Sequence, residues 1–527
     1  MKNVSSTKAP PFSSKYLSST NTDYKPCLAA REENILSLRK RKLDDHLLKK
    51  RIKMLQDKSS HSSQYEVTSS SLNLSSDIIN ETYHTPKEFI NAMITNLQSN
   101  AISKIKYALF QIRKMSIERE DLIEELYKAN IVDYLLSIMN TNINDNYIIY
   151  ESLWIMINIT SKIMTKELTN SFLSESSYAL YIRIFDKGIN DIRDSLLWLL
   201  VNVSMGNEQA MSSLVYSSLI ANHVIPYITT EKEIPKESLK MSINLLSSIV
   251  NGIKFSSSFP PSEKIKSTEE KITKILCDYI YTNDEEMAND CLYGLSSLSN
   301  SSNEKVFNII YASGIIRRIV KKEAKISINN AENIIKLLGN FLSNMSNEVI
   351  DILFFKEIVI FLEDFITHSN NNKILHDAFW ALSNICCFPS EQITIIINSS
   401  IVPIMISKIK DADHFVGHEA LYCLANLITS NDINIAINIS QYDIIEVLLK
   451  SIEKYYQNPQ SIQLIVESLG TLFEIGERIK KQTNNQNVYI NTCWNKGGKD
   501  LLEKLLNYQD NGVYKTVSNI IQNYFSY

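Results

Sequence analysis

Trp380 and Asn384 stand four residues apart in an apolar, helix-forming stretch that begins at His376. On an α-helix, residues i and i+4 lie on one face. The indole is a flat apolar wall, and the carboxamide beside it both donates and accepts hydrogen bonds. Such a pair catalyses nothing, but it can hold an extended peptide by a side-chain stem and by the backbone. A single pair is more often part of a helix core.

The pair recurs along the chain, and this recurrence favours a binding surface over a core. Further aromatic residues with an Asn four positions later are Trp154/Asn158, Trp198/Asn202 and Tyr422/Asn426. Asn158 and Asn202 are 44 residues apart, and Asn340, Asn384 and Asn426 follow at intervals of 44 and 42. Repeats of this length predict a solenoid of stacked helical units, in which equivalent helices face one concave surface.

Composition agrees with an all-α chain. Of 527 residues, 44% are hydrophobic, enough for a continuous core, and only 12 are Gly and 11 Pro, too few for the turns of a β-sandwich or barrel. The N-terminus has no apolar segment typical of a secretory signal, and the most apolar window, 349–366, contains five charged residues. We therefore expect neither secretion nor a membrane span.

No motif for catalysis, a cofactor or a metal is found in the sequence. The seven Cys form no C-x-x-C pair, which favours reduced, buried thiols in an intracellular protein. His414 and His418 are spaced i, i+4, but no third ligand is near in sequence. Phosphate-binding loops and nucleophile motifs are absent. We therefore predict a binding protein that is not an enzyme and has no cofactor.

Charge is concentrated in the segment 31–53. It carries nine Lys or Arg and four acids, a balance of +5, so the remainder carries −9. The Leu and Ile residues of this segment predict a helix with a narrow apolar stripe. Such a helix is too polar to be buried in a core, so we expect it to bind a partner. A solvated charged helix is the alternative. A nucleic-acid arm is less favoured because the acids would repel phosphates. We divide the chain into a disordered tail (1–24), a basic arm (25–56), a flexible linker (57–85) and a helical solenoid (86–527) that starts at Thr85-Pro86.

The arm resembles the importin-β-binding segment of importin-α, the nuclear-import adaptor. The residues that match are Arg31-Glu32-Glu33, Leu38-Arg39-Lys40, Lys42, Asp44-Asp45, Leu47-Leu48 and Lys49-Lys50-Arg51. It departs from the family where Ala29 and Ala30 replace a run of Arg before the Glu pair. The resemblance implies that Arg31, Arg39, Lys40 and Lys42 bind importin-β. It also implies that Lys49, Lys50 and Arg51 mimic a localisation signal and occupy the chain's own groove.

The repeats resemble those of importin-α over essentially all of 86–527, which implies a right-handed superhelical solenoid of about ten armadillo repeats. In that family the Trp/Asn groove binds basic nuclear-localisation signals at a larger site on repeats two to four and a smaller one on repeats six to eight. The cargo-binding residues carried over are Trp154, Asn158, Trp198, Asn202, Lys336, Asn340, Trp380, Asn384, Glu419, Tyr422 and Asn426.

The larger site lacks several of the family's binding residues in this sequence. Repeat four has Asn244 and Ser248 where the family has Trp and Asn, and the family's acid after the third repeat falls at Gly206 or Asn207. We therefore predict that repeats six to eight carry the larger share of cargo binding.

The resemblance implies a shuttling adaptor in cytoplasm and nucleus, with importin-β, basic cargo and an export receptor as partners and nucleoporins as a further candidate. Neither nucleic acid nor membrane is expected. The alternative is an armadillo scaffold with a role outside transport. The basic arm favours the adaptor, because a scaffold has no need of it.

Overall fold

The computed structural model describes residues 83, 85–119, 121–253, 263–301, 303–322, 330–344, 351–386, 388–430, 432–483 and 485–525. The predicted tail, the basic arm and nearly all of the linker lie outside these residues. Every regular element in the described ranges is a helix, so the all-α prediction is confirmed. The chain divides into two compact units, an N-terminal unit up to Ser313 and a C-terminal unit from Gly314, each of which is described by itself.

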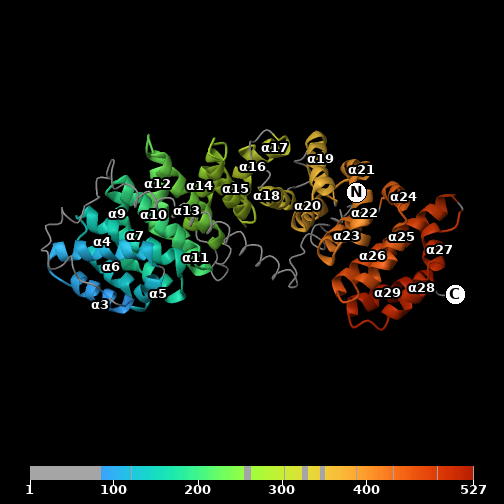
Figure 1. The fold of residues 1–527 in the computed structure, drawn as a ribbon. Coiled ribbons are helices and arrows are strands. Elements are labelled where there is room, and N and C mark those ends of the chain that lie inside the picture. Colours follow the sequence, from blue (N-terminus) through green and yellow to red (C-terminus); the bar gives the residue numbers. More distant parts are fainter. Residues whose placement is uncertain are drawn as a thin grey trace, which may run out of the picture. The chain divides into compact units, whose positions relative to one another are not determined.

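The N-terminal unit is drawn from blue to yellow-green in Figure 1. Its helices are α3 (Pro86–Leu97), α4 (Ile102–Glu118), α5 (Asp121–Lys128), α6 (Ile131–Thr141), α7 (Asn146–Lys162), α8 (Lys166–Phe172), α9 (Glu175–Asp186), α10 (Asn190–Ser204), α11 (Glu208–Val215), η3 (Ile220–Val224), α12 (Ile225–Thr230), α13 (Lys236–Ile249), η4 (Val250–Ile253), α14 (Glu263–Tyr279), α15 (Glu285–Leu298) and α16 (Glu304–Ala312). Thr85, the predicted helix start, caps α3 by accepting from the Glu88 N–H.

The C-terminal unit is drawn from yellow to red in Figure 1. Its helices are α17 (Ile315–Val320), α18 (Ala331–Asn344), α19 (Ile352–His368), α20 (Asn372–Ile385), α21 (Ser390–Ile397), α22 (Ile401–Asp411), α23 (His414–Thr429), α24 (Ile433–Ser440), α25 (Ile444–Lys454), α26 (Pro459–Thr483), α27 (Val488–Asn495), α28 (Gly498–Leu505) and α29 (Asn511–Tyr524).

A triplet of helices repeats within both units. A short helix, a second helix and a longer third helix follow one another, as in α5–α6–α7, α8–α9–α10, α21–α22–α23 and α24–α25–α26. The third helices pack side by side: α4, α7, α10, α13 and α15 in succession in one unit, and α18, α20, α23, α26 and α29 in the other. Three helices per repeat of about 42 residues is the armadillo arrangement, so the chain is an armadillo-type solenoid.

Short polar residues set the turns between these helices. Asp145, Asn371 and Asp413 cap the third helices α7, α20 and α23 by accepting from backbone N–H groups of the first turn. The turn from short to second helix passes through left-handed backbone at Asn130 (φ 52°) and Gly314 (φ 70°), conformations that Gly and Asn adopt readily. The third helices therefore begin at a fixed register in each repeat.

The core runs along the third helices. In α7, 14 of the 17 residues are buried, because α4 and α10 flank it and α5 and α6 pack on it as well. The five described cysteines are buried free thiols.

No single helix in the described ranges is long and apolar enough to cross a membrane. The helices α21 and α22 reach the required length and composition only when they are taken together, and they are bent by 70° relative to each other.

Candidate functional site

All the predicted cargo-binding residues in the repeats lie on third helices. Trp154 and Asn158 are on α7, Trp198 and Asn202 on α10, Lys336 and Asn340 on α18, Trp380 and Asn384 on α20, and Glu419, Tyr422 and Asn426 on α23. The first four form the N-terminal cluster, which lies on adjacent helices of the N-terminal unit. The other seven form the C-terminal cluster, on three adjacent helices of the C-terminal unit.

The Asn side chains link neighbouring third helices. Asn384 Nδ2 donates to the Gly339 carbonyl on α18 (3.0 Å), and Asn426 Nδ2 donates to the Ser383 carbonyl on α20 (3.0 Å). In the N-terminal unit, Asn158 donates to Ser116 Oγ at 2.9 Å. Each amide therefore fixes the register between two repeats. A carboxamide has two N–H donors and an acceptor oxygen, so one such bond does not exhaust its capacity.

The two indoles of the N-terminal cluster are part of the core. The exposed fractions of Trp154 and Trp198 are 2% and 1%, and their ring centroids lie 5.7 Å apart in an edge-to-face contact. Rings at this distance touch each other. In this conformation no slot for a Lys or Arg stem remains between them. The ring of Tyr150 also packs against Trp154, with the two ring centroids 6.2 Å apart.

The acids near these indoles have internal partners or are replaced. Glu151, three residues before Trp154, is 2% exposed and accepts from Arg113 Nε at 2.6 Å. Burial by itself would lower the pKa of Arg113, but the charge and hydrogen bond of Glu151 outweigh it and raise the pKa above its ordinary value. Asn207 caps α11 through its Oδ1 and donates to Thr169 through its Nδ2, so it offers no negative charge.

Trp380, in the C-terminal cluster, is only partly buried, and no aromatic ring of the described residues stacks on it. Its indole lies across α18 at Gly339, where an added Cβ would come within 2.1 Å of the indole Cζ3. Glycine at this position therefore lets the indole approach the backbone of the neighbouring helix closely. The side chain of Trp380 still keeps some access to solvent.

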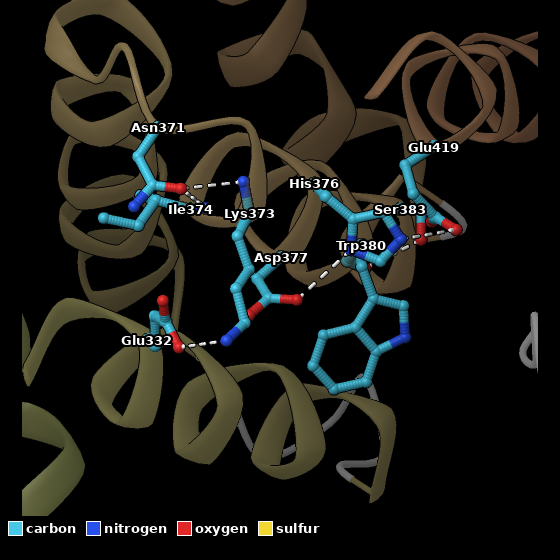
Figure 2. A network of polar contacts seen from close by, with 9 residues as sticks. All are labelled: Glu332, Asn371, Lys373, Ile374, His376, Asp377, Trp380, Ser383 and Glu419. Atoms are coloured by element: carbon cyan, nitrogen blue, oxygen red, sulfur yellow. Dashed lines mark hydrogen bonds and ion pairs between the residues drawn. The ribbon is translucent and has the colours of Figure 1, made fainter. Parts of the chain in front are cut away.

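Two buried carboxylates lie beside Trp380. The exposed fractions of Asp377 and Glu419 are 3% and 1%. Figure 2 shows the His376 ring between them, with Nδ1 3.2 Å from Asp377 Oδ1 and Nε2 3.6 Å from Glu419 Oε1. Lys373, one turn earlier on α20, pairs instead with Glu332 of α18 at 2.9 Å. The cluster thus combines a partly exposed indole with concentrated negative charge, a combination suited to basic side chains.

Tyr422 stands on α23 at the position that Trp380 holds on α20. It is partly buried, and burial followed by the charge of Glu419 raises its pKa to about 12. The phenol is therefore neutral at physiological pH and keeps its O–H as a donor. His418, one turn earlier on α23, contacts the Tyr422 ring edge-on at 4.8 Å.

His418 makes the stability of the C-terminal unit depend on pH. Burial, followed by the nearby His376 and His414, lowers its pKa from 6.5 to about 4. Between these values the unfolded chain binds a proton that the folded chain does not, so stability is complete above pH 6.5 and falls as the pH drops to about 4. We expect a loss of about 3 kcal/mol across this window.

His418→Leu removes this titration. The unfolding free energy of the C-terminal unit, measured by urea titration at about pH 4 and about pH 7, should change by about 3 kcal/mol less in the variant than in the parent chain. Equal losses in both proteins would contradict the assignment.

Sequence comparison finds similarity to importin alpha subunits. It is 24% identical to importin subunit alpha-4 of Arabidopsis thaliana over 521 residues, which cover 97% of this chain and 91% of that one. It is 27% identical to importin subunit alpha-2 of Arabidopsis thaliana over 294 residues, but this match spans only half of that relative's length. The chain is therefore similar to importin-α subunits along almost its whole length. No family model matches it.

A solved structure supports the fold of this importin-α relative independently. The crystal structure of an engineered protein superposes with a TM-score of 0.66 and 18% identity, covering 83% of this chain and 99% of that one. At this identity the match concerns the fold alone.

Several residues that shape the two clusters were not predicted as site residues from the sequence: Asp377, His376, Gly339 and the Arg113–Glu151 pair. A signal for the acids was present, because an acid stands three residues before the aromatic residue at Glu151/Trp154, Asp377/Trp380 and Glu419/Tyr422. No comparable pattern marks His376 or Gly339. Within the described ranges, no group of three or more His, Cys, Asp or Glu could hold a metal ion.

Proposed function

We propose that this chain is a nuclear-import adaptor that binds basic localisation signals mainly at the C-terminal cluster. The observation that carries this is the partly exposed Trp380 beside the buried carboxylates Asp377 and Glu419. A Lys or Arg stem can pack on the indole while its charge approaches the acids, and the Asn row offers amides to the peptide backbone. No catalytic step is involved.

The N-terminal cluster contributes less in this proposal. Its two indoles contact each other, and the acid beside Trp154 pairs with Arg113 within the protein. Cargo would have to separate a packed core pair and compete with an internal guanidinium. This follows the prediction from the sequence, where repeats two to four lack the family's acid and the pair of repeat four.

The other proposed partners are inferred from the sequence of the basic arm, which lies outside the described residues. We propose that Arg31, Arg39, Lys40 and Lys42 bind importin-β, and that Lys49, Lys50 and Arg51 compete with cargo for the groove. The chain then shuttles between cytoplasm and nucleus and is returned by an export receptor, with nucleoporins as a further candidate partner. Binding of the full chain to importin-β, lost on Arg39→Ala with Lys40→Ala, tests the arm.

The groove is tested with a fluorescein-labelled peptide of lysine and arginine. It is titrated into the full chain carrying Lys49→Ala, Lys50→Ala and Arg51→Ala, which removes the internal competitor. We expect Trp380→Ala to weaken binding at least about tenfold, since buried aromatic anchors typically contribute about 2 kcal/mol or more.

The matched control is Trp494→Ala. Trp494 lies on α27, outside both clusters, and is 53% exposed, so its loss should leave the peptide affinity unchanged. If Trp380→Ala binds the peptide as tightly as the parent chain, the C-terminal groove is not the site.

The second candidate is an armadillo scaffold without a transport role. The observation in its favour is that the two indoles of the N-terminal cluster pack against each other. A scaffold predicts that the full chain binds neither importin-β nor the basic peptide. The two titrations above therefore separate the candidates.

A further inference from the structure

His376 lies between the two buried carboxylates beside Trp380. It lies one turn before Trp380 on α20, and its side chain is only 12% exposed. Its ring stacks on Phe415 of α23, with centroids 3.9 Å apart and an interplanar angle of 10°. Figure 2 shows it bridging from Asp377 on its own helix to Glu419 on the next.

The carboxylates need such a partner. Burying a negative charge is costly unless a cation or hydrogen-bond donors compensate it. An imidazole meets these carboxylates through its ring nitrogens, whereas Lys and Arg bring a permanent charge. A basic side chain that enters beside Trp380 therefore compensates the buried carboxylates more strongly than the imidazole does.

The other charges around His376 follow from the helix register. Lys373 contacts Glu332, and Trp380 contacts Gly339, so α20 and α18 are aligned with an offset of 41 residues in both places (373 − 332 and 380 − 339). The same offset puts Lys336 level with Asp377. A second basic residue, on α18, is therefore aligned with this carboxylate.

Several other ionisable groups on the helices packed around α20 are engaged elsewhere, neutral or exposed. On α19, Glu357 and Asp364 pair with Lys321 and Lys322. On α23, the depressed pKa of His418, about 4, keeps this residue neutral above about pH 5. His414 is exposed at the start of α23 and is the other histidine near this network.

We infer that His376 is a specificity-determining residue that covers Asp377 and Glu419 in the empty groove and must be displaced by the basic side chain of a peptide. The inference rests on the proposed peptide-binding function. The basic side chain of the peptide and the imidazole compete for the same two carboxylates. Peptide affinity therefore rises when the imidazole is removed and falls when a permanent cation takes its place.

Two substitutions with opposite expected effects test this. His376→Gln keeps a hydrogen-bond donor but cannot become charged, and His376→Lys places a permanent cation over the acids. We use the full chain with Lys49→Ala, Lys50→Ala and Arg51→Ala, and the labelled lysine–arginine peptide.

His376→Gln should bind the peptide roughly three- to tenfold more tightly than the chain with His376, a difference of about 1 kcal/mol. His376→Lys should bind the peptide more weakly than the chain with His376. A purely structural role of His376 would weaken binding in both variants.

The outcomes separate this inference from the proposed function. If Trp380→Ala abolishes binding while His376→Gln and His376→Lys both retain the affinity of the chain with His376, the groove stands and the role of His376 is overturned. If Trp380→Ala leaves binding unchanged, or the parent chain binds no basic peptide, the proposed function and this inference fall together.

Discussion

Trp154→Ala is expected to destabilise the N-terminal unit by about 3–5 kcal/mol, the range for removing a large aromatic side chain from a packed core. Trp154 is 2% exposed and contacts both Trp198 and Tyr150 through its ring. Hydrogen exchange of α7 and α10 in the full chain measures the loss locally. An exposed groove residue would give a much smaller change.

The control for this substitution is Trp380→Ala. Since Trp380 is only partly buried, its loss should cost clearly less stability than the loss of Trp154, while peptide affinity falls. The two indoles of the same sequence motif would then have opposite principal roles. A destabilisation by Trp154→Ala below about 1 kcal/mol would contradict the assignment of the N-terminal cluster to the core.

Arg113→Met is expected to destabilise the same unit by about 3–5 kcal/mol, because it leaves the carboxylate of Glu151 buried without its cation. Arg113 Nε lies 2.6 Å from Glu151 Oε2, and the two side chains are 13% and 2% exposed. The double substitution Arg113→Met with Glu151→Leu should recover much of the loss, since no unpaired charge then remains. Chemical unfolding of the four proteins forms a double-mutant cycle.

An exposed ion pair in the same unit provides the matched control. Arg119 Nη2 lies 2.6 Å from Asp121 Oδ2, but the two side chains are 39% and 56% exposed. Arg119→Met should therefore change stability by less than about 1 kcal/mol. If Arg113→Met costs no more than Arg119→Met, burial does not make the Arg113–Glu151 pair important.

The sequence by itself determined the repeat and therefore the fold. The spacing of the Asn residues at 42 or 44 positions required one repeated unit, and the shortage of Gly and Pro required helices. Both signals are local or periodic, so they can be read without knowing which residues meet in space. The same periodicity placed every predicted groove residue on a third helix.

Only the tertiary structure decided which of these repeated pairs is buried. Trp154 and Trp380 have the same neighbour four residues later, yet one packs against Trp198 and the other lies over Gly339. Exposure depends on what the adjacent repeat presents, and that residue is some 40 positions away in the chain. The bridge from His376 to Glu419 arises in the same way, because the stacking of α20 on α23 brings these side chains together.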